Sequence, residues 1–289
     1  MNLNNFCFDG KKKFNYKTFN TSGDSKKYKK EKILKEIQSD ILKLKKFQDR
    51  LYAEGKEAVL IIIQAMDAAG KDGIIKHVMA GINPQGVKVS NFKQPSVEEL
   101  AHDYLWRSHK VLPRKGRIGI FNRSYYEDVL VSKVHELYKF QLMPKRCKTK
   151  NIFKLRYKQI VNFEKYLWEN GVTVLKFFLC ISKKTQKERF LKRIDDTSKN
   201  WKFSKSDLEE RKHWGKYMSA YQDAINATGK KTAAWYVIPA DQKWYARRLV
   251  LNILLKSFKE INPKYPEFQK NKRNEFLSYK KILTSEEKK

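Results

Sequence analysis

The chain has 289 residues, of which 41% are hydrophobic, so it can form one large packed domain, with or without an insertion. Its 63 Lys and Arg residues against 31 Asp and Glu residues give a formal charge of +32, which indicates an anionic partner such as nucleic acid, an anionic membrane or a polyanionic substrate. The three cysteines, Cys7, Cys147 and Cys180, include no C-x-x-C pair, so neither a zinc site nor a disulfide framework is expected. No apolar run is long enough to span a bilayer and the N-terminus has no secretory core, so we expect a reduced, soluble, cytoplasmic protein.

The first part of the chain has one long helical pattern followed by a strand pattern. Residues 1–27 are polar and show no period, which predicts an irregular N-terminal arm. Apolar residues recur every three or four positions over residues 28–54, which predicts an amphipathic helix ended by Gly55. The aliphatic run at 58–64 predicts the first strand, and after a loop we expect a helix that continues to about Asn83.

The middle of the chain continues this alternation. Residues 87–92 predict a second strand, and Ser96 with Glu99 predicts a capping box at the start of a helix that continues through His109. Residues 117–122 predict a third strand that is buried on both faces.

The remaining segments complete an α/β pattern. We expect mostly helix over 129–170 with a break at Met143-Pro144, a fourth strand at 172–181, a charged segment without strands at 183–231, a fifth strand at 235–239, a helix at 243–261 and a charged tail at 263–289. Alternating strands and helices predict a parallel five-stranded sheet with helices on both faces. The predicted organisation is an arm (1–27), one domain (28–262) and the tail.

The segment from Ala65 to Gly73 (AMDAAGKDG) is expected to be a phosphate-binding loop between the first strand and its helix. Such a loop directs backbone N–H groups and a helix N-terminus at an anion. The match to G-x-x-x-x-G-K-[ST] is imperfect, because Ala65 replaces the first glycine and Asp72 replaces the final Ser or Thr. An ordinary strand-to-helix turn with a surface lysine is the alternative. The candidate phosphate-binding residues here are Ala68, Ala69, Gly70, Lys71, Asp72 and Gly73, with Lys76 one turn further on.

Phosphoryl transfer requires carboxylates for a metal ion and arginines over the transferred group, besides the phosphate loop. Asp67 in the loop and Asp128 after the third strand are the candidate ligands for Mg²⁺, which proteins hold with one or two carboxylates and substrate phosphates. Asp128 is otherwise interpreted as an acid that stabilises a helix N-terminus. Arg123 at the end of the third strand either points into the same cleft or forms a structural ion pair with Glu127 or Asp128.

The charged segment 183–231 is interpreted as a helical lid. Arg189 and Arg193 are four residues apart on one face of a predicted helix, so they could close together over phosphates and exclude water. A basic helix that only faces solvent is the alternative. Trp201, which lies among bases, is interpreted as packing the lid rather than stacking on a nucleobase.

Taken together, these segments resemble the polyphosphate kinase 2 family over roughly residues 30–260. The matching segments are 65–73 (AMDAAGKDG), 92–95 (FKQP), 121–128 (FNRSYYED), 182–193, Trp201-Lys202 and 235–239 (WYVIP) with Lys243. The resemblance implies a three-layer α/β/α P-loop kinase fold, similar to thymidylate kinase, with a helical lid. It also implies reversible phosphoryl transfer between inorganic polyphosphate and nucleotides, dependent on Mg²⁺ with Mn²⁺ as an alternative.

The resemblance further implies which residues and partners take part. The residues that matter in the family correspond here to Asp67, Lys71, Arg123, Asp128, Arg189 and Arg193. The expected nucleotides are AMP, ADP and ATP, with GDP and GTP as further candidates, and family members are commonly homo-oligomers, either dimers or tetramers. The start of the loop (QAMD, 64–67) and the YYED ending (125–128) resemble the subclass that uses both AMP and ADP. No nucleic acid and no membrane is expected as a partner.

The high charge is consistent with such a substrate, because polyphosphate carries about one negative charge per phosphate and would be held like a nucleic-acid backbone. The candidate residues for a basic channel are His77, Arg107, Arg114, Lys115, Arg117 and Lys192, while Lys133 is expected near the nucleotide phosphates together with Lys76. Two other functions remain open. An ATP-dependent nucleotide kinase of similar fold should end its loop in Ser or Thr, and a nucleic-acid-binding protein should contain a recognisable binding motif.

Overall fold

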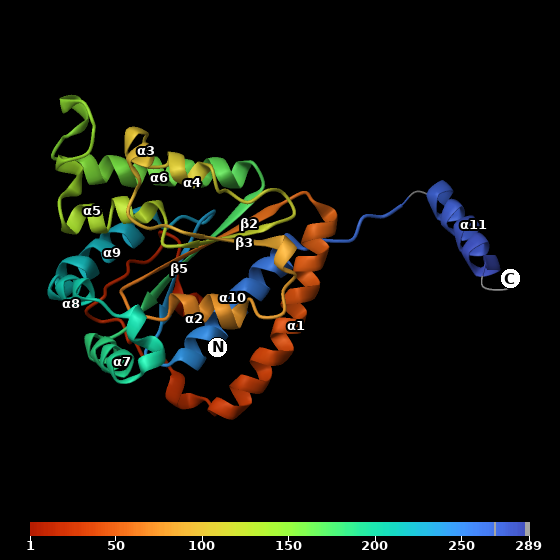
Figure 1. Ribbon diagram of the computed structural model, residues 1–289, viewed down its shortest axis with the longest axis horizontal. Helices are drawn as coiled ribbons and strands as arrows, with labels where there is room; N and C mark the ends of the chain where they lie inside the picture. Colours follow the sequence, from red (N-terminus) through yellow and green to blue (C-terminus); the bar gives the residue numbers. More distant parts are fainter. Residues whose placement is uncertain (269, 287–289) are drawn as a thin grey trace.

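A six-stranded sheet runs through the centre of the molecule in the order β1-β6-β5-β2-β4-β3 (Figure 1). The structure, a computed structural model, describes residues 1–268 and 270–286. The strands are β1 (Cys7–Phe8), β2 (Ala58–Ala65), β3 (Val87–Asn91), β4 (Ile118–Asn122), β5 (Val172–Cys180) and β6 (Trp235–Pro239). Strands β2 to β6 are parallel, as predicted, and each lies close to its predicted position. The expected number of five strands was wrong by one, because β1 pairs antiparallel with β6.

Helices cover both faces of the sheet, as the three-layer prediction requires (Figure 1). The helices are α1 (Lys30–Glu54), α2 (Lys71–Val78), α3 (Val97–Ala101), α4 (Trp106–His109), α5 (Val131–Val134), α6 (Ile152–Glu169), α7 (Lys183–Asp195), α8 (Lys205–Lys212), α9 (Trp214–Thr228), α10 (Lys243–Ile261) and α11 (Lys270–Glu286). Helices α1, α2 and α10 pack on one face, and α6 and α9 pack on the other. The segment with α7 and α8 lies at one end of the sheet, where the predicted lid should be.

Strand β2 shows how the sheet forms two hydrophobic cores. All eight of its residues are buried. Because successive side chains of a strand point to opposite faces, Val59 and Ile61 pack with α1, α2 and α10, while Leu60 and Ile62 pack with α6 and α9. A strand covered on both sides needs apolar residues at every position, which explains the unbroken aliphatic run.

The N-terminal arm is ordered along the domain rather than wholly irregular. It contains β1 and two short 3₁₀ helices, Leu3–Phe6 and Ser25–Lys27. The buried Phe14 makes edge-on contacts with Phe178 of β5, and its backbone N–H donates to Asn226 Oδ1 of α9 at 2.7 Å. The arm therefore covers the edge of the sheet beside β6.

The short helices differ most from the predictions. The helix after the phosphate loop ends at Val78 rather than near Asn83. The capping box of Ser96 and Glu99 is present, but the helix that it starts ends at Ala101 and α4 follows separately. Over 129–170 only α5 and α6 are α-helical, and two 3₁₀ turns, Leu137–Lys139 and Lys145–Cys147, lie between them. Short helices that are held by tertiary contacts show little periodicity of their own, so the sequence pattern predicted longer helices than the structure has.

The C-terminal tail leaves the domain after α10. In Figure 1 the residues that follow α10 lead away from the sheet, and α11 lies apart from it. The predicted tail of 263–289 extends partly beyond the described residues. None of the helices in the described ranges combines the length and the apolar character that a membrane span requires.

Candidate functional site

The predicted phosphate loop connects the carboxyl end of β2 to the first turn of α2. Gly70 has φ 107° and is the N-cap of α2, and Ala68 has φ 61°. Both values lie in the left-handed region, which glycine adopts freely and alanine only at a cost in free energy. These two residues turn the chain sharply, so that the N-terminus of α2 faces the end of the sheet, where an anion is favoured.

A cavity of about 600 Å³ lies over this loop, between α2, α10 and the lid. Basic side chains surround it, and the acids Asp67 and Asp72 of the loop also line it. The basic residues of the lining are Lys71, Lys93, Arg123, Arg189, Lys192, Arg193, Lys199, Lys202, Lys243 and Arg247. A cavity with this excess of cations, above a helix N-terminus, can bind an extended chain of phosphates.

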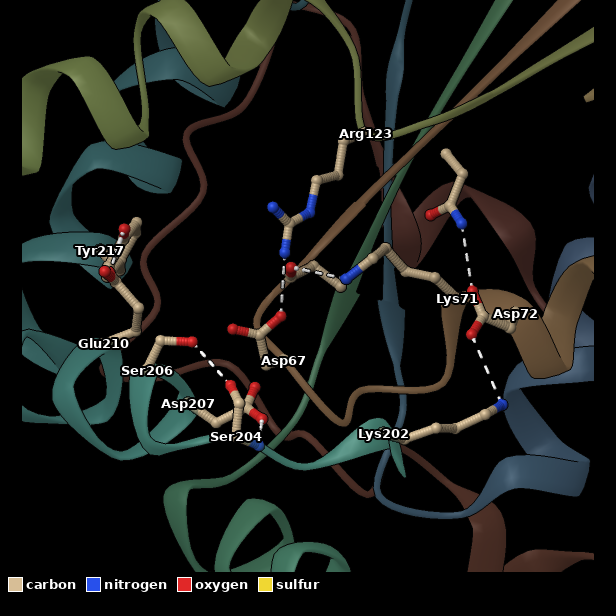
Figure 2. Close-up of polar contacts among 12 residues, drawn as sticks. Asp67, Lys71, Asp72, Arg123, Lys202, Ser204, Ser206, Asp207, Glu210 and Tyr217 are labelled. Carbon is tan, nitrogen blue, oxygen red and sulfur yellow. Dashed lines mark hydrogen bonds and ion pairs between the residues drawn. The ribbon is translucent and has the colours of Figure 1, made fainter. Parts of the chain in front are cut away.

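Charged groups of both signs meet at the base of the cavity (Figure 2). Arg123 Nη2 donates to Asp67 Oδ1 at 3.1 Å, and Lys71 Nζ donates to the backbone oxygen of Ala65 at 3.3 Å. Burial lowers the pKa of Lys71, and the charge of Asp67 opposes this shift. Burial alone would also lower the pKa of Arg123, but Glu127 and Asp67 together raise it. Two basic groups thus lie close to the carboxylates of Asp67 and Glu127 at this point.

Arg189 holds the phosphate loop in place. Its Nη1 donates to the backbone oxygens of Ala68 and Ala69 at 3.0 and 2.7 Å, and its Nη2 donates to those of Ala240 and Asp241 at 2.6 and 3.0 Å. One guanidinium therefore joins the lid helix α7, the phosphate loop and the segment between β6 and α10. The carbonyl groups of Ala68 and Ala69 are thereby turned toward Arg189 and away from the N-terminus of α2.

Two other lid residues also contact the phosphate loop. Gln186 Nε2 donates to the backbone oxygen of Asp67 at 3.0 Å, and Lys202 Nζ lies 3.9 Å from Asp72 Oδ2 (Figure 2). Arg193 Nη1 donates to the backbone oxygen of Lys202 at 3.0 Å and also lines the cavity. The segment predicted as a lid is therefore closed over the phosphate loop.

Comparison with known proteins shows to which family the chain belongs. The family model of polyphosphate kinase 2 matches residues 24–266. The chain belongs to the polyphosphate kinase 2 family. It is 45% identical to an ADP-polyphosphate phosphotransferase from Rhodopseudomonas palustris, with 86% of each chain covered, and 48% identical to an AMP/ADP-polyphosphate phosphotransferase from Meiothermus ruber, with 78% of this chain and 80% of the relative covered.

A solved structure shows that the fold also agrees with the family. The crystal structure of polyphosphate kinase 2 from Arthrobacter aurescens superimposes with a TM-score of 0.80 at 38% identity, covering 87% of this chain and 88% of that one. The family and the α/β fold expected from the sequence are thereby confirmed.

Asp128, in contrast, does not face the phosphate loop. Its Oδ1 accepts a hydrogen bond from Gln141 Nε2 at 3.2 Å and lies 3.9 Å from Arg156 Nη1. It lines a second cavity of about 470 Å³, together with Arg107 and Tyr104. The expectation that Asp128 shares an ion with Asp67 is therefore not supported by the geometry. The acid of the YYED segment that lies near Lys71 and Arg123 is Glu127.

Several predicted channel residues also lie elsewhere. Arg114, Lys115 and Arg117 precede β4, so they lie at the amino end of the strand whose carboxyl end carries Arg123. Lys115 donates to the backbone oxygen of Asn170, and the Arg117 guanidinium lies 4.0 Å from the ring centroid of Tyr52. These three side chains therefore lie at the opposite edge of the sheet from the phosphate loop and do not line the cavity over it, contrary to the expectation. The expectation followed closeness to a motif in the sequence and did not consider the direction of the strand.

The remaining basic candidates have separate positions. Arg107 is buried, donates to the backbone oxygen of Lys93 at 2.9 Å and lines the second cavity. Lys133 forms an ion pair with Asp223 at 2.7 Å. Lys76 and His77 are exposed on α2 outside the cavity, whereas Lys192 lines it.

Several residues that line the cavity have no site role predicted from the sequence. These are Lys93, Lys199, Lys202, Lys243 and Arg247. Glu127, whose carboxylate interacts with the charges of Lys71 and Arg123, is a further residue of this kind. Lys243 and Arg247 are four residues apart at the start of α10, directly after the carboxyl end of β6. Since β6 is parallel to β2, this position was a signal that could have identified them.

The carboxylates of the cleft suit a divalent cation that is also held by phosphate. In the described parts of the chain, no three His, Cys, Asp or Glu side chains come together to hold a metal by themselves. Mg²⁺ in phosphoryl-transfer sites needs only one or two carboxylates, since substrate oxygens and water supply the other ligands. Asp67, with Glu127 nearby, provides such a donor set.

Proposed function

We propose that this protein transfers phosphoryl groups reversibly between inorganic polyphosphate and nucleotides, from ADP to ATP and from AMP to ADP. The observation that carries the proposal is the cavity over the phosphate loop, where basic side chains from the loop, the lid and α10 converge in a member of the polyphosphate kinase 2 family. The match to relatives that are named for ADP and for both AMP and ADP supports these acceptors.

The roles of the residues follow from where charge develops during transfer. Phosphoryl transfer depends on positioning and on charge neutralisation more than on covalent chemistry by the protein. Lys71 and the N-terminus of α2 would bind the donor phosphates, and Arg123 would lie over the transferred group. Arg193 and Lys192 from the lid would neutralise charge and exclude water when the lid is closed.

Asp67 and Glu127 are the residues that we propose to hold Mg²⁺, with Mn²⁺ as an alternative. The bound ion would supply charge neutralisation between donor and acceptor oxygens. An acid inside a phosphate loop weakens phosphate binding unless a cation lies between them. The direct partner of Asp67 in the structure is Arg123, so this carboxylate also orients the arginine.

One assay distinguishes the proposal from the alternatives. Purified protein is incubated with Mg²⁺, ADP and polyphosphate without ATP, and ATP formation is followed; AMP and GDP are then tested as acceptors. ATP formation is expected. A protein that only binds nucleic acid would form no ATP. A nucleotide kinase that does not use polyphosphate could form ATP from two ADP molecules, but it would do so equally in a sample without polyphosphate; either result would contradict the proposal.

The metal assignment has its own test. Asp67→Asn and Glu127→Gln are expected to lower the rate by about tenfold or more and to raise the Mg²⁺ concentration needed for half-maximal rate, since each removes a charged ligand without changing shape. Asp128→Asn, in the second cavity, is the comparison and should leave the Mg²⁺ dependence unchanged. A shifted Mg²⁺ dependence in Asp128→Asn alone would reverse the assignment.

Other properties are expected from the family resemblance. We propose GDP and GTP as further nucleotides, a homo-oligomeric assembly, either a dimer or a tetramer, and no nucleic-acid partner. We place the reaction in the cytoplasm, where nucleotides are consumed and regenerated. Light scattering of the purified protein would test the assembly.

A further inference from the structure

A buried ion pair lies beneath the turn that carries Arg123 and Glu127. Lys176 of β5 and Glu164 of α6 are 0% and 1% exposed, and Lys176 Nζ lies 2.6 Å from Glu164 Oε2. The attraction within such a pair is largely offset by the loss of hydration of both charges, so a buried ion pair is weak evidence for a role in stability alone. A contribution to stability therefore does not by itself explain why the ion pair lies at this place.

Two neighbouring tyrosines connect this ion pair to the candidate site. The hydroxyl groups of Tyr125 and Tyr126 both donate to Glu164 Oε1, each at 2.9 Å. Lys176 Nζ also lies 3.0 Å from the Tyr126 hydroxyl. Both tyrosines are fully buried. The single carboxyl group of Glu164 therefore fixes the position and the orientation of both rings. A hydrogen bond to a charged group is the stronger kind.

The tyrosines begin the 3₁₀ turn Tyr125–Asp128, which follows Arg123 directly and contains Glu127. Arg123 has φ 63°, a left-handed conformation that an arginine adopts only where the surrounding structure holds it. Ser124 Oγ accepts hydrogen bonds from Gln64 Nε2 and from the backbone N–H of Tyr126, and so ties the same turn to β2. The turn is thus held from two sides, by β2 and by Glu164.

We propose that Glu164 and Lys176 are positioning residues for phosphoryl transfer. Glu164 anchors Tyr125 and Tyr126, and Lys176, whose Nζ lies 2.6 Å from Glu164 Oε2, orients that carboxyl group. The anchored turn places the Arg123 guanidinium against Asp67 and brings Glu127 near Lys71. The roles of Arg123 and Glu127 come from the proposed function, on which this inference rests.

Two charge-neutral double variants test the proposal directly. Glu164→Gln with Lys176→Met removes both charges but leaves an amide oxygen for the tyrosines, whereas Glu164→Leu with Lys176→Met removes the charges and the oxygen. We expect kcat for ATP formation to stay within about threefold of wild type in the first variant and to fall by about tenfold or more in the second. The KM for ADP should change less than kcat in both, because Arg123 acts on the transferred group.

Two single variants keep the test decisive if the second double variant does not fold. Tyr126→Phe leaves the ion pair intact and should lower kcat by at least about threefold at unchanged KM. Tyr245→Phe, a buried tyrosine of α10 in the other core, is the matched control and should change Tm without changing kcat.

The outcomes separate the two proposals. Equal kcat in the two double variants, or a wild-type kcat in Tyr126→Phe, would overturn the positioning role. If the wild-type protein itself forms no ATP from ADP and polyphosphate, the proposed function fails instead.

Discussion

Glu127 and Asp128 are neighbours in sequence but face different parts of the molecule. They lie in a 3₁₀ turn, in which successive side chains point about 120° apart. Glu127 therefore lies near Lys71 and Arg123, while Asp128 is paired with Gln141 and Arg156. Burial raises the pKa of both carboxyl groups, and in each case nearby arginine charge opposes the shift. A shift of one residue along the backbone thus changes which charged groups surround the carboxylate.

Lys71→Ala should remove nearly all transfer activity, by about 10²- to 10³-fold, because this ammonium neutralises phosphate charge at the base of the cavity. The fold should persist, since the aliphatic cores do not depend on it. ATP formation and Tm are the measurements. Lys46→Ala, on the exposed face of α1, is the control for loss of one positive charge. Activity equal to that of the control would exclude the role of Lys71.

The central site residues could be predicted because of where they lie along the chain. Asp67, Lys71 and Arg123 all follow the ends of parallel strands, and such ends meet at one edge of the sheet. Asp128 could not be placed, because no periodic pattern describes a four-residue turn. Lys199 and Lys202 were not given site roles, because only the folded lid brings them to the cavity.

At the scale of elements, lid helix α7 carries two arginines with different tasks. Arg189 donates to four backbone oxygens of two segments, whereas Arg193 lines the cavity and donates to one backbone oxygen of the lid. A planar guanidinium can bridge several oxygens, which an ammonium group cannot do in the same geometry.

We therefore expect Arg189→Lys to lose nearly as much kcat as Arg189→Ala, up to about 100-fold, since a displaced loop misplaces the phosphates. Arg193→Lys should retain clearly more activity than Arg193→Ala, because it keeps the charge. The four variants are compared by kcat and by KM for ADP. Full activity in Arg189→Lys would show that only its charge matters.

Helices α1 and α10 are joined by a second arginine. Arg248 of α10 forms ion pairs with Glu36, at 3.0 Å, and with Asp40 of α1. Burial would raise the pKa of Asp40, but hydrogen bonds from Lys43 and Arg248 lower it below its usual value. The carboxylate form is therefore favoured in the folded state, and this contribution to stability is lost as pH falls through the folded pKa.

Asp40→Asn should lower the free energy of unfolding at pH 7 by about 1–3 kcal/mol. The difference from wild type should be constant above about pH 5 and should shrink below about pH 4, where the unfolded carboxylate begins to bind protons. Denaturant unfolding at several pH values measures both the loss of stability at pH 7 and its dependence on pH. A difference that stays constant down to pH 3 would contradict the lowered pKa.

The long periodic helices and the parallel strands were predicted well, whereas the short helices and β1 were not. The bounds of α10 agree with the pattern at 243–261, because its apolar face is repeated over five turns against one core. Strand β1 has two residues and pairs with a strand near the other end of the chain, so no local signal marked it.

At the scale of the whole molecule, the net charge is +32, and ten of the 63 lysine and arginine residues line the cavity over the phosphate loop. Polyphosphate binding should weaken steeply as salt rises, with log Kd increasing linearly with log salt concentration, because several bases release counterions together. Lys243→Gln should reduce the magnitude of that slope by about 1, and Lys46→Gln should leave it unchanged. A Kd that is flat between low and physiological salt would exclude a multi-site basic channel.

The pairing of β1 with β6 has a consequence for synthesis on the ribosome. Phe14 and Asn226, which hold the arm against α9, are 212 residues apart. The arm therefore leaves the ribosomal exit tunnel well before its partners. Until β6 and α9 emerge, the aromatic residues of the arm are without their native contacts, and such transiently exposed surface favours aggregation. Final closure of this sheet edge must wait until β6 has been translated and has left the tunnel.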